Sequence, residues 1–118
     1  MKLSFESDPK IADGLVVRLS GNLEIIGASQ LWESISARTG EETRFFIFDF
    51  SDVPIVTSAG IGVLVRFLVR LRGYGGAVAI CGCSEKIKEV FGIVMLLDLL
   101  QVCDSEEEAR GRLSAAIS

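Results

Sequence analysis

The spacing of apolar and polar residues near the start of the chain predicts two strands. Leu3–Glu6 alternates apolar and polar side chains, as a half-exposed strand does. Leu15–Leu19 follows the turn pair Asp13-Gly14 and is the expected hairpin partner. We therefore expect the chain to open with two antiparallel strands.

Two later segments are apolar on both faces, a pattern typical of strands that have packed layers on each side. They are Phe45–Phe48 and Ala77–Cys81. Between them, Ile61–Leu71 has the composition of a long, mostly buried helix, and the glycines of Gly73–Gly76 end it. A strand, helix and strand in this order cross over right-handedly, so the two strands are expected to be parallel.

Three further helices are predicted from serine caps followed by apolar residues at helical spacing. The caps are Ser29, Ser84 and Ser105. Asp98–Val102 could add a short strand. The expected fold is therefore α/β, with a mixed sheet of four to five strands and about four helices.

Length and charge limit the kind of protein this can be. A chain of 118 residues suffices for one domain, which we expect to span residues 1–118 around a single core. The net charge is −4 and no run of Lys or Arg is present, so no nucleic acid is expected as a partner.

Neither a secretory signal nor a membrane span is evident. The start, MKLSFESD, lacks a basic head with an apolar stretch, and Arg66 and Arg70 interrupt the longest apolar helix. We expect a cytoplasmic protein without membrane insertion. The chain has no His and an odd number of Cys, which favours buried reduced thiols over disulfides or zinc. No metal and no cofactor are expected.

The stretch Val56–Gly62, VTSAGIG, is the strongest candidate for a site. It falls where a strand ends and a helix begins, the position at which open α/β sheets most often bind ligands. A purely structural alternative stays open at this point. Ser58 or Thr57 could simply cap the helix while Ala59 and Gly60 pack closely.

The chain as a whole resembles the STAS family, the anti-sigma factor antagonists. The resemblance rests on motifs that occur in the family's order and at its intervals. They are Gly21–Glu24, Asp49–Val53, Thr57–Gly62, the later turn Gly75–Gly76 and the helix Ser84–Phe91. It implies a STAS-like (SpoIIAA-like) single domain that regulates another protein and catalyses no reaction.

By this resemblance, Ser58 matches the serine that a cognate kinase phosphorylates. The implied partner is an anti-sigma factor or a histidine-kinase-like serine kinase, which the unphosphorylated protein binds and the phosphorylated protein releases. The implied partner-binding residues are Asn22, Glu24, Thr57, Ser58, Ala59, Gly60 and Gly62. A homodimer is left open.

Three positions depart from the family's motifs. Thr57 replaces the usual acidic residue before the acceptor, Ala59 replaces a second hydroxyl residue, and Glu24 replaces an Asp. Thr57 is therefore a rival acceptor. A second reading keeps the fold but makes the chain a non-switching accessory subunit in a larger transport or signalling complex. An enzyme is disfavoured, because the sequence has no His and no GxxxxGK[ST] phosphate loop.

Overall fold

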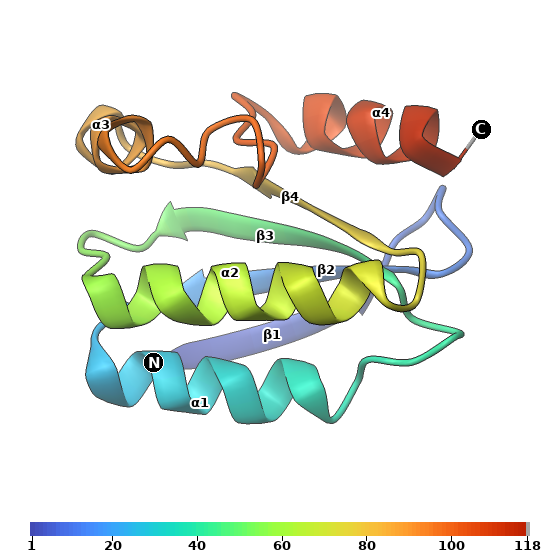
Figure 1. The fold of residues 1–118 in the computed structure, drawn as a ribbon, viewed down its shortest axis with the longest axis horizontal. Helices are drawn as coiled ribbons and strands as arrows, with labels where there is room; N and C mark the ends of the chain where they lie inside the picture. Colours follow the sequence, from blue (N-terminus) through green and yellow to red (C-terminus); the bar gives the residue numbers. More distant parts are fainter. Residues whose placement is uncertain (118) are drawn as a thin grey trace.

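A computed structural model describes residues 1–117, the last of them by its backbone alone, and shows helices packed on both faces of one sheet (Figure 1). The four-stranded sheet has the order β1-β2-β3-β4. β1 is antiparallel to β2, whereas β2 with β3 and β3 with β4 are parallel. The elements are β1 Lys2–Ser7, β2 Gly14–Ser20, α1 Ile25–Ser36, β3 Phe45–Asp52, α2 Ser58–Arg72, β4 Ala77–Cys81, α3 Glu85–Ile93 and α4 Glu106–Ile117. The predicted α/β class and mixed sheet are confirmed.

Strand β3 separates two apolar clusters, because successive side chains of a strand point to opposite faces. Phe46, Phe48 and Phe50 join buried residues of α1, α2 and α3 on one face. Phe45 and Ile47 face α4 on the other. The larger cluster is rich in aromatic edge contacts, including Phe46 with Phe67 of α2, whose ring centroids lie 4.8 Å apart. The prediction of a central strand buried on both faces is thus confirmed.

Two predicted caps are confirmed and one is wrong. Ser84 accepts a hydrogen bond from the amide of Ile87 at 3.2 Å, and Ser105 accepts one from Glu108 at 3.1 Å. Ser29, however, lies inside α1, which begins at Ile25 after an extended Glu24. The helix starts earlier because hydrogen bonds from another part of the chain fix the backbone just before it.

The stretch Asp98–Val102 does not form a regular strand. It is joined to the sheet by a single parallel bridge between Val102 and Ile80, whose hydrogen bonds are made by the neighbouring Gln101 and Cys103. The turn between α2 and β4 is as tight as its glycines indicate. Gly75 has φ +75°, and a Cβ at Gly76 would lie 2.1 Å from the carbonyl oxygen of Arg44.

Within residues 1–117, no helix combines the length and apolar character that crossing a membrane requires. In the same part of the chain, no cluster of His, Cys, Asp or Glu side chains could hold a metal ion.

Candidate functional site

The starts of α1 and α2 lie side by side because the segments before them pair through their backbones. Leu23 donates its amide hydrogen to the carbonyl of Ile55 at 2.8 Å, and Thr57 donates to the carbonyl of Leu23 at 3.1 Å. Leu23 and Val56 form a parallel bridge. The motifs Gly21–Glu24 and Thr57–Gly62, far apart in sequence, therefore meet at one place.

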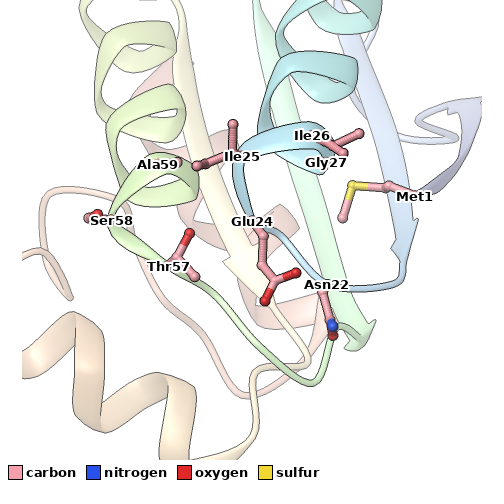
Figure 2. A pocket seen from close by; sticks show the side chains of 9 residues that line it. All are labelled: Met1, Asn22, Glu24, Ile25, Ile26, Gly27, Thr57, Ser58 and Ala59. Atoms are coloured by element: carbon pink, nitrogen blue, oxygen red, sulfur yellow. The ribbon is translucent and has the colours of Figure 1, made fainter.

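A groove of about 620 Å³ lies between these two helix starts (Figure 2). Its lining residues are Met1, Asn22, Glu24, Ile25, Ile26, Gly27, Thr57, Ser58 and Ala59. Ile25 and Ile26 are 78% and 74% exposed, which is unusual for large aliphatic side chains. Glu24 is the only charged side chain among the lining residues. The groove therefore combines an apolar rim with two hydroxyls, the side-chain amide of Asn22 and one carboxylate.

Ser58 is the first residue of α2 and is exposed. Among the described residues, its hydroxyl has no hydrogen-bond partner. Thr57, the N-cap residue, is half-buried, and its hydroxyl makes only a long contact of 3.4 Å with the carbonyl of Leu23. In Figure 2 the Thr57 side chain lies between those of Ser58 and Glu24.

No side chain caps the N-terminus of α2. Thr57 occupies the N-cap position, but neither its hydroxyl nor that of Ser58 accepts a hydrogen bond from a first-turn amide, so the part of the structural alternative in which one of them caps the helix with its side chain is wrong. The first-turn amides of α2 have no side-chain acceptor, and no acidic residue lies in that turn. A helix N-terminus in this state favours an anion.

The two glycines of the motif have different surroundings. Gly60 is buried, and a Cβ there would lie 2.6 Å from Cγ of Leu23 and 2.8 Å from its carbonyl oxygen. Gly62 is exposed, and a Cβ there would meet nothing within 4 Å. Gly60 thus allows α2 to pack against Leu23, whereas Gly62 keeps the outer surface of α2 flat.

The structure brings most of the predicted partner-binding residues to the groove. Asn22 and Glu24 are exposed at the start of α1, and Thr57, Ser58 and Ala59 line the opposite side. Gly60 and Gly62 lie on α2 beyond the lining residues.

Four groove residues were missed by the sequence analysis. They are Met1, Ile25, Ile26 and Gly27. The adjacent isoleucines carried a usable signal. Consecutive residues of a helix point in different directions, so two adjacent isoleucines in the first turn can rarely both be buried.

A charge cluster that does not line the groove lies at the end of β3. Arg18 donates to Asp49 at 2.9 Å, and the hydroxyl of Ser51 donates to the same carboxylate at 2.6 Å. Burial opposes ionisation of Asp49, but the hydrogen bonds from Ser51 and Arg18 outweigh it and lower the pKa of Asp49. This cluster holds the second family motif in place.

The cysteines are free thiols. Burial raises the pKa of Cys81 and of Cys83 to about 12, and it also raises the pKa of Cys103. A thiol is a nucleophile only as the thiolate, so these residues are poor candidates for chemistry.

Comparisons with known proteins agree with this geometry. A family model described as STAS domain matches residues 3–109. The chain is similar to BtrV of Bordetella bronchiseptica, which is named as an anti-sigma factor antagonist. The two are 27% identical over 117 residues, covering 99% of this chain and 98% of the relative.

Two solved structures have the same fold. The anti-sigma factor antagonist SpoIIAA in its unphosphorylated form gives a TM-score of 0.76 at 22% identity, covering 95% of this chain and 97% of that one. The Bacillus cell fate determinant SpoIIAA in the phosphorylated form gives a TM-score of 0.69 at 23% identity. The match covers 92% of this chain and 98% of that one.

Proposed function

This chain belongs to the STAS domain family, and on that premise we propose that it is an anti-sigma factor antagonist that works by partner switching. In its unphosphorylated form it binds an anti-sigma factor that is also a serine kinase. Phosphorylation of Ser58 releases that partner. The observation that supports this most directly is the exposed, unpartnered Ser58 hydroxyl at the edge of the groove. The role needs no catalysis by this chain and belongs in the cytoplasm, where ATP is available.

The unmodified groove suits a protein partner. Ile25 and Ile26 present apolar area that folding leaves exposed, and burying such area is the main favourable term in association. Ala59 and Gly62 add little bulk, so a partner's backbone can approach the start of α2 closely. The hydroxyl of Ser58 stays accessible to an active site brought there by the same partner.

A phosphate on Ser58 would change this surface through its charge. It adds about −1.5 to −2 charges at neutral pH. The N-terminus of α2 stabilises an anion in the free protein, but in a complex the phosphate must lose water at the edge of a groove that already holds the carboxylate of Glu24, which has the same sign of charge. A penalty of about 3 kcal/mol would weaken the complex roughly a hundredfold.

The structure favours Ser58 over Thr57 as the acceptor. Thr57 is half-buried, and its hydroxyl faces the carbonyl of Leu23. A kinase would have to turn this side chain outward before transferring a phosphoryl group to it. Ser58 needs no such rearrangement.

The test is to incubate the protein with ATP and a candidate serine kinase, and to measure intact mass. We expect one added phosphate on the wild type and on Thr57→Ala, and none on Ser58→Ala. Ser29→Ala is the matched control, since Ser29 is another exposed serine, on α1 and outside the groove lining. Phosphate on Ser58→Ala but not on Thr57→Ala would move the acceptor to Thr57.

Binding provides the second readout. The phosphomimetic Ser58→Asp should capture the kinase at least tenfold more weakly than Ser58→Ala, while both variants keep the wild-type melting temperature. If the protein captures the partner but never gains phosphate, the switch fails. The reading as a non-switching accessory subunit then replaces it.

A further inference from the structure

The two edges of the sheet differ in their backbone hydrogen bonding. Along β4, Ile80 donates its amide hydrogen to the carbonyl of Gln101 at 3.1 Å, and Cys103 donates to the carbonyl of Ile80 at 2.7 Å. The side-chain amide of Gln101 also donates to the carbonyl of Val78 at 2.9 Å. In the described part of the chain, β1 has no comparable cover, because its backbone bonds only to β2.

The free backbone groups of β1 can be assigned from its register. Asp8, just after β1, donates its amide hydrogen to Gly14 at 2.9 Å, and this pair continues the register of β1 with β2. In an antiparallel ladder, alternate residues bond to the same neighbour. Lys2, Ser4 and Glu6 therefore bond to β2. The amides and carbonyls of Leu3 and Phe5 point to the open edge.

The sequence of β1 is complementary to itself in the antiparallel direction. When Ser4 stands opposite Ser4 of a second copy, Leu3 stands opposite Phe5 and Lys2 opposite Glu6. Both residues of the Leu3 and Phe5 pair have outward backbone groups, so the pair can exchange its two hydrogen bonds. The charged pair then lies on the exposed face, because Lys2 and Glu6 are exposed.

The charges select this register over its neighbours. A slip by two residues in one direction places Lys2 opposite Ser4. In the other direction it places Glu6 opposite Ser4 and Lys2 opposite Asp8. The carboxylate of Asp8 is buried against Arg110 and so is not available for a pair. Lys2 has no ion pair within the described residues, whereas Glu6 makes one with Arg18 at 3.3 Å and remains 56% exposed. Opposite charges directly across two strands stabilise their pairing, and like charges oppose it.

We propose that the open edge of β1 pairs with β1 of a second copy of this chain, in the register that joins Lys2 to Glu6. The contact has two-fold symmetry, so each ion pair and each Leu3 and Phe5 pair occurs twice. The two sheets become one continuous sheet. Ser58 lies on α2, outside the contact strand, so the proposal is independent of the phosphorylation switch.

The area of one strand pair is small compared with the roughly 1,200–2,000 Å² of a stable interface. The dimer should therefore be weak and reversible. The test is sedimentation velocity of the purified chain from about 5 to about 500 µM, a range that covers weak association. We expect the mass to rise with concentration from 12.8 kDa toward twice that value.

Charge reversal tests the register. Lys2→Glu and Glu6→Lys each place like charges opposite one another, so each should weaken dimerisation at least tenfold. The double variant Lys2→Glu, Glu6→Lys should restore it, because both pairs are rebuilt with the signs exchanged. Lys10→Glu is the matched control, an exposed lysine outside β1 with the same change of charge, and should dimerise like the wild type.

Hydrogen exchange gives an independent readout. Amides of Leu3 and Phe5 should become protected as concentration rises, while those of Ser4 and Glu6 keep the protection that pairing with β2 gives them. A monomer throughout the concentration range overturns the proposal. A dimer that Lys2→Glu weakens no more than Lys10→Glu, or that leaves the Leu3 and Phe5 amides unprotected, overturns it equally.

Discussion

The amide of Thr57 donates to the carbonyl of Leu23 at 3.1 Å, and the side chain of the same leucine covers Gly60 one turn into α2. Leu23 is fully buried. Leu23, in the segment before α1, therefore fixes both where α2 begins and how closely the first turn of α2 approaches that segment. The shape of the groove depends on this contact.

Substitutions of the two motif glycines should have opposite effects on stability. Gly60→Ala forces a Cβ against Leu23, so we expect a loss of about 1–3 kcal/mol from overpacking. Gly62→Ala meets open space in a helix and should stabilise the fold by about 0.5–1 kcal/mol. Denaturant unfolding of both variants measures this. Equal effects would contradict the packing seen at Leu23.

A buried ion pair should stabilise the contact between α4 and the turn after β1. Arg110 donates to Asp8 at 2.9 Å, and the side chains are 14% and 1% exposed. Arg110→Leu leaves the carboxylate buried without its cation, so we expect a loss of about 3 kcal/mol in the free energy of unfolding.

The matched control for this variant is Arg112→Leu. Arg112 pairs with Glu108 one turn apart on α4, and the two side chains are 45% and 42% exposed. A pair this exposed contributes about 0–0.5 kcal/mol. If Arg110→Leu lowers the free energy of unfolding no more than Arg112→Leu does, the buried pair does not hold α4 against the turn after β1.

Asp49 should make the fold sensitive to acid. Its pKa is lower in the folded protein than in the unfolded chain, so the ionised carboxylate stabilises the fold above about pH 3.9. This stabilisation is lost as the pH falls through the lower, folded pKa. Asp49→Asn should therefore differ most from the wild type near neutrality and converge with it in acid. Urea unfolding at a series of pH values measures the difference, with the exposed Asp52→Asn as control.

The thiols should react only when the protein unfolds. Burial raises the pKa of Cys81 and Cys83 to about 12, so neither thiol is appreciably ionised at neutral pH. An aromatic disulfide reagent should label the native protein slowly and the denatured protein at all three cysteines. Fast labelling of the folded protein would show that the thiols are reachable without unfolding.

The central part of the fold was predictable because local patterns and tertiary packing agree there. Ala77–Cys81 was predicted as a strand and is β4. Phe45–Phe48 was predicted as the central strand, and the observed β3 extends beyond it to Asp52. A run of apolar residues between turn signals leaves few alternatives when both faces of a strand are covered.

The start of α1 was not predictable in the same way. Ser29 has the chemistry of a cap, but the backbone bonds of Leu23 to Ile55 and Thr57 end the preceding segment and let the helix begin at Ile25. These bonds join residues distant in sequence, so no local pattern reports them. The same pairing brings the exposed Ile25 and Ile26 to the groove. The sequence motifs therefore predicted Thr57 and Ser58 as site residues but not the two isoleucines that lie across from them.

The bridge between Leu23 and Val56 has a consequence for anything designed to block this surface. The groove is a discontinuous surface, since neither the segment before α1 nor the segment before α2 forms it alone. A synthetic peptide copied from either segment would lack its counterpart and should compete poorly. An inhibitor or antibody directed at the groove has to be selected against the intact domain.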